Sequence, residues 1–350
     1  MAAQEITIAG RKIGVNYPPY VIAEMSANHN GSLDRALKVV QMAKSAGADA
    51  VKIQTYTADT MTIDCDSEEF RIRGGLWDGF SLYELYQQAH TPFEWHKDIF
   101  EYSRKLGITC FSTPFDESAV DLLEDLNAPA YKIASFEAID LPLIEYVART
   151  KKPLIISTGM ANYEEIGEAV EAAKGAGCEE LVLLHCVSGY PTPVDQANLR
   201  TLPDIAGSFG VISGISDHTL GTVVSVASVA LGACVIEKHV TLSRKDEGPD
   251  SEFSIEPDEL SALCSEAKSV WKALGSAGYE RKDAENENVK FRRSIYVVED
   301  IKAGEKFTEE NIRRIRPGYG LAPKYYVELI GRSANTDLPK GTALKWEYVE

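Results

Sequence analysis

Eight short apolar runs, separated by stretches with helical periodicity, constrain the fold of this chain more than any other feature. They lie at 21–27, 50–55, 109–115, 130–137, 153–159, 181–188, 211–218 and 235–242. Most are nearly continuous in valine, isoleucine and leucine, as in parallel strands that are buried on both faces. Eight strands alternating with helices over about 250 residues predict an α/β fold of the (β/α)8 TIM-barrel type. The alternative, an open doubly wound sheet, normally carries a glycine-rich fingerprint after an early strand, and none is found here.

The clearest helix is expected at 33–46. Apolar residues recur there at helical spacing from Leu33 to Ala43. Ser32 can cap its start and Gly47 can end it in a left-handed conformation. The gap between the second and third strands is too long for one helix and holds an aromatic-rich segment at 74–96. We expect that segment to form a lid or a pocket wall, with a purely structural helical excursion as the alternative.

A change in composition divides the chain. We expect a catalytic barrel at 1–280, a polar and charged linker at 281–290 and a small domain at 291–350. The small domain contains two related units, IKAGEKFTEENI and LPKGTALKWEYV, each a β-turn followed by a short amphipathic segment. So small a domain buries little surface by itself, and we expect it to dock on something larger.

Composition excludes several classes of protein. A net charge of −17 argues against a nucleic-acid binder or an anionic-membrane binder, although a few basic residues can still form a local pocket for an anionic substrate. No apolar run reaches the roughly 18 residues of a membrane span, and the N-terminus lacks the order of a signal peptide. The six cysteines are scattered without a CxxC pair. Buried free thiols and a cytoplasmic location are therefore expected.

Polar residues end the predicted strands one after another. In a barrel of this type the chemistry takes place at the carboxyl ends of the strands. Polar groups in apolar strands cost free energy unless they are paired, so their recurrence indicates a site. These strand-end residues are Glu24, Asn28, Lys52, Gln54, Ser112, Thr113, Lys132, Ser135, Glu137, Ser157, Ser188, Asp217, His218, Glu237 and His239.

His218 and His239 end the last two predicted strands and should be neighbours in a closed barrel. Two imidazoles can hold a divalent metal with the help of water or a carboxylate such as Glu24 or Asp250. The alternative is a pair of hydrogen-bonded structural histidines, because no compact ligand motif such as HExxH is present.

Lys52 and Lys132 point from strands that should otherwise be apolar, so each needs an anionic partner. A bound phosphate or carboxylate is one partner, and an internal glutamate such as Glu24 or Glu137 is the other. A third possibility is a Schiff-base aldolase that uses Lys132. Three serines can add neutral hydrogen bonds to phosphate oxygens: Ser135, Ser157 and Ser216. In the small domain, an arginine of RRIRPGYG is either part of a charged surface turn or reaches another domain's pocket.

These segments together resemble the sialic acid synthase family over essentially the whole chain. The motifs that carry the resemblance are EMSANHNGS, KIQTYT, STPF, YKIAS, STGM, YPTP, SDHT, EKH, GPD and RPGYG, in that order. The resemblance implies a barrel followed by a small antifreeze-like (SAF) domain. It also implies a domain-swapped homodimer in which that domain covers the partner's active site.

The resemblance also implies roles for individual residues. His218 and His239 match a metal-binding pair that holds manganese, magnesium or cobalt. The matches to phosphoenolpyruvate contacts are Lys52, Thr113, Lys132, Ser135, Ser157 and Ser216. Glu24 and Glu137 match acidic active-site residues, and Gln54 and Tyr190 match residues that line the pocket. Asp250 matches a residue by the sugar, and Arg316 matches an arginine that reaches the partner's pocket. Ser188 departs from the asparagine common in the neuraminic branch.

The inserted segment resembles that of the pseudaminic branch of the family, through GGLWDG, LYELYQQA and TPFEWH. This implies condensation of phosphoenolpyruvate with 2,4-diacetamido-2,4,6-trideoxy-L-altrose. The alternatives are the same reaction on the legionaminic or N-acetylneuraminic precursor, a non-catalytic sugar-binding protein, and a lysine aldolase.

Overall fold

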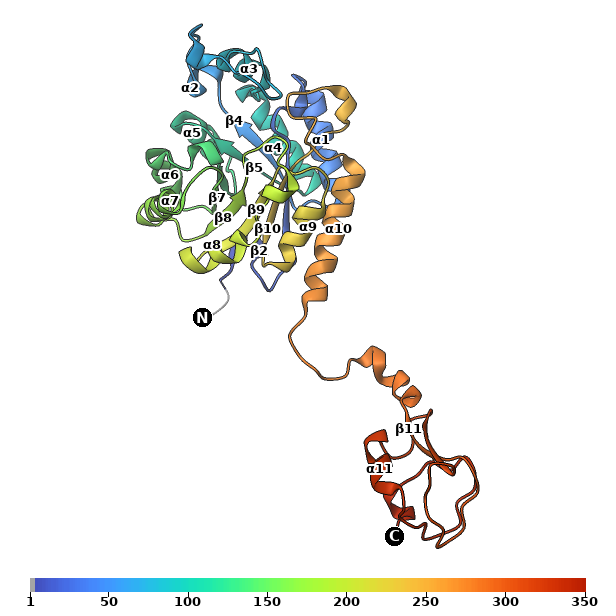
Figure 1. The fold of residues 1–350 in the computed structure, drawn as a ribbon. Helices are drawn as coiled ribbons and strands as arrows, with labels where there is room; N and C mark the ends of the chain where they lie inside the picture. Colours follow the sequence, from blue (N-terminus) through green and yellow to red (C-terminus); the bar gives the residue numbers. More distant parts are fainter. Residues whose placement is uncertain (1–3) are drawn as a thin grey trace. The chain divides into compact units, whose positions relative to one another are not determined.

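The computed structural model describes residues 4–350, which form two compact units (Figure 1). The first unit ends at Gly275 and the second comprises Ser276–Glu350. No helix in the described part of the chain is long and apolar enough to cross a membrane.

The first unit is a closed barrel of parallel strands, as the apolar runs predict. The strands follow one another around the barrel in chain order, and the last pairs with the first, so no sheet edge is left open. Its strands are β3 (Tyr20–Glu24), β4 (Ala50–Thr55), β5 (Thr109–Pro114), β6 (Tyr131–Ile133), β7 (Leu154–Ser157), β8 (Leu181–Cys186), β9 (Ile212–Asp217) and β10 (Val235–His239).

Helices surround the barrel and cover the outward faces of the strands (Figure 1). They are α1 (Leu33–Ala46), α4 (Phe93–Leu106), α5 (Glu117–Asp125), α6 (Leu141–Ala148), α7 (Tyr163–Gly175), α8 (Thr201–Phe209), α9 (Val223–Ala230) and α10 (Pro257–Leu274). The expected helix at 33–46 is confirmed with both ends. The Ser32 side chain accepts the Arg35 amide, and Gly47 adopts φ 92°.

The inside of the barrel is apolar at its amino end. Side chains such as Tyr20, Phe111 and Val182 form one buried cluster there with residues of an N-terminal hairpin. The hairpin pairs β1 (Ile6–Ile8) with β2 (Arg11–Ile13), and the eight apolar runs do not include it. Because this end is filled, the open space is confined to the carboxyl ends of the strands.

The long connection between β4 and β5 contains α2 (Ala58–Met61), η2 (Glu68–Phe70) and α3 (Leu82–Ala89). Ser81 and Glu84 form a reciprocal capping box that fixes the start of α3. Tyr56, at the beginning of the connection, packs edge-to-face on Tyr86 of α3 at 5.9 Å between ring centroids. The connection is therefore folded onto the barrel rather than extended away from it.

The second unit has its own small core, built around the antiparallel pair β11 (Ser294–Val297) and β12 (Ile312–Ile315). It also contains the short helix α11 (Tyr326–Leu329), and the 3₁₀ helix η6 (Asp283–Phe291) covers most of the expected linker. The two related sequence units lie side by side, since Ile301 and Leu338 exchange backbone hydrogen bonds of 2.9 and 2.8 Å.

Candidate active site

A cavity of about 650 Å³ opens at the carboxyl ends of the strands. Side chains alternate along each strand, so every second residue points into the barrel. Most of the residues predicted from the sequence line this cavity: Glu24, Lys52, Gln54, Lys132, Ser135, Glu137, Ser157, Tyr190, Ser216, His218, His239 and Asp250. Glu237, Trp77 and Phe253 line it as well.

Two buried lysines and two buried glutamates lie together at the floor of the cavity. Lys52 Nζ is 2.9 Å from Glu24 Oε2 and 3.6 Å from Glu237 Oε1. Lys132 Nζ is 3.4 Å from the same Glu237 oxygen. Lys52 also donates to Thr113 Oγ1 at 2.9 Å, which places Thr113 behind the lysine. Lys52 therefore has an internal glutamate partner, Glu24, and the partner of Lys132 is Glu237 and not Glu24 or Glu137.

These four groups have different electrostatic environments, and burial raises the pKa of Glu24 despite the nearby Lys52. Burial disfavours the charged form of Lys52, but the carboxylates of Glu237 and Glu24 outweigh burial and raise its pKa. Burial lowers the pKa of Lys132, which forms one ion pair, with Glu237. Burial alone would raise the pKa of Glu237, but Lys132 and Lys52 outweigh it and lower that pKa. An ammonium group carries three donors, so Lys132 has donors available for an added anion.

Serine hydroxyls surround the space beside Lys132. Ser157 Oγ is buried and has no hydrogen-bond partner within residues 4–350. The Gly159 amide donates to Ser135 Oγ at 3.1 Å. A Cβ atom at Gly159 would lie 2.2 Å from the Ser188 hydroxyl and 2.7 Å from that of Ser135, so the glycine of STGM is needed for this close approach. Native proteins rarely leave buried polar atoms unpaired, so the site is suited to a polar ligand.

His218 and His239 lie side by side on the adjacent strand ends, with ring centroids 5.3 Å apart. His218 Nδ1 lies 3.1 Å from the Val187 carbonyl oxygen, and a donor Nδ1–H there leaves Nε2 as the ligand atom. His239 Nδ1 is buried without a partner in the described chain, and Asp250 Oδ2 lies 4.0 Å from it. Burial, and then the nearby His218, lowers the pKa of His239 well below its ordinary value, which favours the neutral form that binds metals.

These two histidines fit a divalent metal ion. Residues 4–350 contain no cluster of three or more histidine, cysteine or acidic side chains arranged as a complete ligand set. Two imidazoles from the chain suit a catalytic ion, whose other positions are filled by water and substrate.

Glu137 stands apart from the charged cluster, on the 3₁₀ segment Ser135–Glu137 after β6. Burial raises the pKa of its carboxyl to about 7. One of its oxygens is buried with no partner within residues 4–350. A carboxyl group that titrates near neutral pH is suited to proton transfer.

One side of the cavity is apolar and comes largely from the connection between β4 and β5. The connection and its flanks contribute Tyr56, Met61, Ile72, Trp77, Leu82, Leu85, Tyr86, Ala89 and Phe115. The Trp77 indole donates to the Pro249 carbonyl at 3.0 Å, which ties this wall to the loop after β10. Trp77 also packs on Tyr190, at 5.7 Å between ring centroids. The expected lid or pocket wall is thus a wall.

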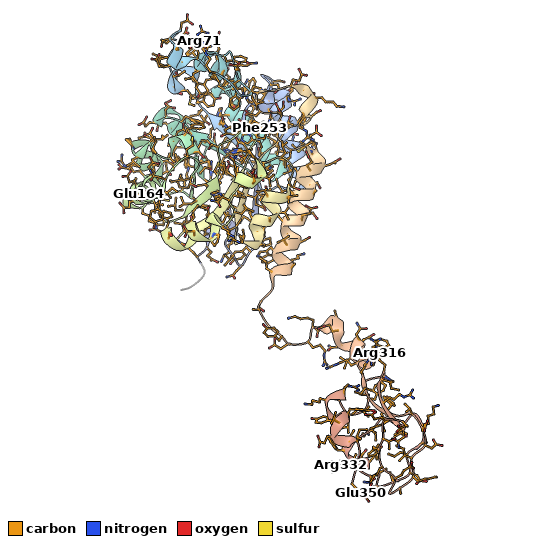
Figure 2. All side chains as sticks on the ribbon, in the orientation of Figure 1. Arg71, Glu164, Phe253, Arg316, Arg332 and Glu350 are labelled. Atoms are coloured by element: carbon orange, nitrogen blue, oxygen red, sulfur yellow. The ribbon has the colours of Figure 1, made fainter. Side chains whose placement is uncertain are left out.

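The polar strand-end residues that lie outside the cavity lining are Asn28, Ser112, Thr113, Ser188 and Asp217. Of the residues given individual roles, two lie elsewhere, and one important residue was given no role. Thr113 contacts Lys52 without lining the cavity, and the exposed Arg316 belongs to the second unit (Figure 2). Glu237 was noted only as a strand-end polar residue. Its position two residues before His239 was the available signal, because residues at that spacing share a strand face.

Comparison with known families agrees with this arrangement. The NeuB family model matches residues 39–279, and the SAF domain model matches residues 292–350. The chain belongs to the NeuB family. The resemblance drawn from the motifs is therefore confirmed.

Relatives of this NeuB-family chain cover nearly its full length. A pseudaminic acid synthase from Campylobacter jejuni subsp. jejuni serotype O:2 is 47% identical over 326 residues, covering 93% of this chain and 95% of that protein. A pseudaminic acid synthase from Helicobacter pylori is 43% identical over 334 residues, covering 95% and 98%. Among solved structures, an N-acetylneuraminic acid (sialic acid) synthetase from Leptospira borgpetersenii serovar Hardjo-bovis superposes with a TM-score of 0.74 at 33% identity, covering 83% and 96%.

Proposed function

We propose that this chain condenses phosphoenolpyruvate with 2,4-diacetamido-2,4,6-trideoxy-L-altrose and water, giving pseudaminic acid and phosphate. The observation that carries the proposal is that Lys132 lines the same cavity as the adjacent imidazoles of His218 and His239. Lys132 has ammonium donors that its one ion pair leaves available. Relatives at 43–47% identity bear the name of this activity.

The anionic substrate is placed beside the lysines. Phosphoenolpyruvate carries a phosphate and a carboxylate, and Lys132 with the hydroxyls of Ser135 and Ser157 offers charged and neutral donors to such oxygens. Ser216 also lines this space, and its hydroxyl donates to Glu237 Oε1 at 3.2 Å. Lys52 is held by Glu24 and Thr113, so its charge contributes to the field while its position is fixed.

The open-chain sugar is placed on the histidine side. A divalent metal held by His218 and His239 (manganese, magnesium or cobalt) would supply Lewis-acid polarisation of the sugar aldehyde. Asp250, beside His239 and also lining the cavity, can accept a hydrogen bond from a sugar hydroxyl or amide.

The reaction forms one carbon–carbon bond and breaks one carbon–oxygen bond. C3 of phosphoenolpyruvate attacks the aldehyde carbon, and the electron deficit that develops at C2 is stabilised by the buried carboxylates of Glu24 and Glu237. Water adds to C2, and its proton passes to a group such as Glu137, whose pKa lies near 7. The aldehyde oxygen, an alkoxide after the attack, takes up this proton and becomes a hydroxyl. Phosphate then leaves with the original C2 oxygen, and the hydroxyl added at C2 gives its proton to the leaving phosphate as it becomes the carbonyl. Phosphoenolpyruvate is already an activated enol, so Lys132 need not form an imine.

The apolar wall supports a 2,4-diacetamido-2,4,6-trideoxy sugar, a class that includes the legionaminic precursor, over N-acetylmannosamine. The proposed sugar has a methyl group at C6 and two acetyl methyl groups, whereas a mannosamine has a hydroxyl at C6. Side chains such as Met61, Ile72 and Leu85 offer hydrocarbon surface to methyl groups and no partner to a hydroxyl.

We further propose a homodimer in which the small domain of one copy brings Arg316 to the other copy's cavity. Exposed apolar side chains support an interface at this end of the barrel, because they occupy the connections that follow β6, β7, β8 and β9, including the first residues of α7 and α9. They are Phe136, Ile139, Met160, Tyr163, Val194, Leu220 and Val223. All six cysteines lie in the described chain as free thiols, which supports a cytoplasmic location.

Phosphate release from phosphoenolpyruvate, with manganese and each of the three candidate sugars, tests the proposal. We expect phosphate release to be clearly fastest with the altrose derivative and to stop when EDTA is added. Turnover of only a legionaminic or neuraminic precursor would contradict the choice of sugar while keeping the chemistry. No phosphate release with any of the three sugars would contradict a catalytic function. Borohydride trapping with substrate that labels Lys132 would replace the mechanism by a lysine imine.

A further inference from the structure

A buried ion pair lies at the ends of β9 and β10, outside the cavity and unused by the chemistry above. Lys238 Nζ is 2.8 Å from Asp217 Oδ2, and the two side chains are 0% and 1% exposed. Neither residue lines the cavity. A buried ion pair is weak evidence for stability, because removing two charges from water costs much of what their attraction returns. The position of this pair suggests another role.

The pair belongs to a hydrogen-bond network that includes Ser225 and Thr219. Asp217 Oδ2 also accepts from the Ser225 hydroxyl of α9 at 2.5 Å, and Oδ1 accepts from the Thr219 amide at 2.9 Å. Lys238 also donates to the Thr219 carbonyl at 2.5 Å. The lysine thus binds both the residue before His218 and the residue after it.

The geometry of the strands places this network directly behind the two histidines. Asp217 and Lys238 are register partners on the neighbouring strands, and they face the surrounding helices. His218 and His239 are the next residues along, so they face the cavity. The network therefore ties together the two backbone segments that carry the rings.

The two rings share one packing partner, Phe253, whose ring centroid lies 6.2 Å from that of His218 and 5.0 Å from that of His239. His239 Nδ1 has no hydrogen-bond partner within residues 4–350, so its place depends on packing and on the backbone at Lys238. His218 has the Val187 carbonyl as a partner, at the end of β8 and away from His239. Between the two strand ends, the outward polar link is the Asp217–Lys238 pair with its contacts to Thr219. The inward link is the Ser216 hydroxyl, which donates to Glu237 Oε1 at 3.2 Å.

We infer that Asp217, Lys238 and Ser225 are positioning residues, which hold His218 and His239 at the separation needed to bind one metal ion. They act through the backbone and touch no reacting atom. The inference rests on the metal site of the proposed function. Outer partners of metal ligands commonly contribute 10–100-fold to metal affinity.

The test measures Mn²⁺ affinity without substrate, from the free-ion electron paramagnetic resonance signal. Asp217→Asn with Lys238→Met removes both charges at once, so neither is left unpaired. We expect the double variant to bind Mn²⁺ about 10–100-fold more weakly. The matched control is Ile215→Val with Ile236→Val, the register pair one step earlier on the same outward faces. It should lower the melting temperature while changing the affinity less than about twofold.

Ser225→Ala keeps the ion pair, and provides the test if the double variant does not fold. It removes one hydrogen bond to Asp217, and we expect a several-fold loss of Mn²⁺ affinity. Affinity within twofold of the parent in a folded double variant, or in Ser225→Ala when the double variant is unfolded, would overturn the inference and leave the metal site standing. A parent protein that binds no Mn²⁺ would overturn both the inference and the proposed metal site.

Discussion

The ammonium nitrogen of Lys52 lies 2.9 Å from a carboxylate oxygen of Glu24, and the two side chains are 3% and 0% exposed. They are register partners on the first two barrel strands. The lysine is thus compensated before any substrate arrives, and an incoming anion adds to a preformed charge cluster. Removal of the Glu24 carboxylate should therefore affect stability as well as catalysis.

Glu24→Gln leaves Lys52 buried with only the more distant Glu237 carboxylate, at 3.6 Å. Breaking a buried pair by removing one partner costs about 3 kcal/mol, and we expect that loss in the free energy of unfolding from urea titration. The control is Glu145→Gln, which removes an exposed pair with Arg149 and should cost less than about 1 kcal/mol. Equal losses in the two variants would show that the Lys52–Glu24 pair is not needed for stability.

Glu137 should make activity depend on pH near neutrality. Its carboxyl has a pKa of about 7, so it is ionised above that pH and protonated below it. If the carboxylate is the active form, kcat should rise as pH increases through 7. Glu137→Gln should lower kcat and abolish this limb of the profile. An unchanged limb in the variant would assign the titration to another group.

The same carboxyl should affect stability in the opposite direction. The ordinary pKa of Glu137 is 4.5, so between pH 4.5 and 7 the folded protein binds a proton that the unfolded chain does not. Its contribution to stability is therefore lost as pH rises across that window, by at most about 1.4 kcal/mol per pH unit. Urea titrations at several pH values should show a smaller decline for Glu137→Gln than for the parent. Parallel curves would contradict the assignment.

Metal removal should abolish the proposed reaction. We expect EDTA to stop phosphate release and Mn²⁺ to restore it. His218→Ala and His239→Ala should each lower Mn²⁺ affinity by at least 100-fold, since each removes one of two protein ligands. His90→Ala is the control, because His90 lies outside the cavity lining. Retained affinity in either histidine variant would place the metal elsewhere.

The apolar wall should determine selectivity for the sugar. Ile72→Ser replaces hydrocarbon by a hydroxyl at the wall, and one or two lost methyl contacts are worth roughly 10–200-fold in kcat/KM. We expect that loss for the altrose derivative, with KM for phosphoenolpyruvate nearly unchanged. Ile63→Ser is the control, because Ile63 belongs to the same connection but is exposed and outside the lining. Similar effects of the two substitutions would contradict a specific role for the wall.

Arg316 allows a test of the dimer by complementation. Arg316→Ala and Lys132→Met should each be nearly inactive alone, the first without any loss of barrel stability. Mixing the two, after dissociation and reassembly, should restore activity, because one site in a mixed dimer combines an intact Lys132 with an intact Arg316. Arg313→Ala, another exposed arginine of the second unit, is the control and should be active. Absence of recovery would contradict a shared site.

Much of the barrel was predictable because its strands are buried on both faces and form continuous apolar runs. The ends of the strands were less predictable. The run at 130–137 forms a strand only to Ile133, and Ser135–Glu137 turns into a 3₁₀ segment where polar side chains enter the cavity. The hairpin at Ile6–Ile13 was missed because three-residue strands leave too short a pattern to recognise.

The site was predictable as a set of residues but not as a set of contacts. Alternation along the strands places Lys132 and Glu237 on inward faces, whereas their contact depends on strand register around the whole barrel. Likewise, the inward histidines were found, but the Asp217–Lys238 pair behind them faces outward and resembles any polar interruption of a strand. Contacts between residues on different strands can be predicted only when the register of the closed barrel is known.

The wall that faces the proposed sugar comes largely from one uninterrupted stretch of chain between β4 and β5, while the charged and imidazole groups come from strands all around the barrel. The residues that carry out the reaction and the residues that select the sugar are therefore encoded in separate parts of the sequence. Exchange of that single stretch between homologous enzymes is expected to redirect which sugar is accepted while the bond-making apparatus remains intact.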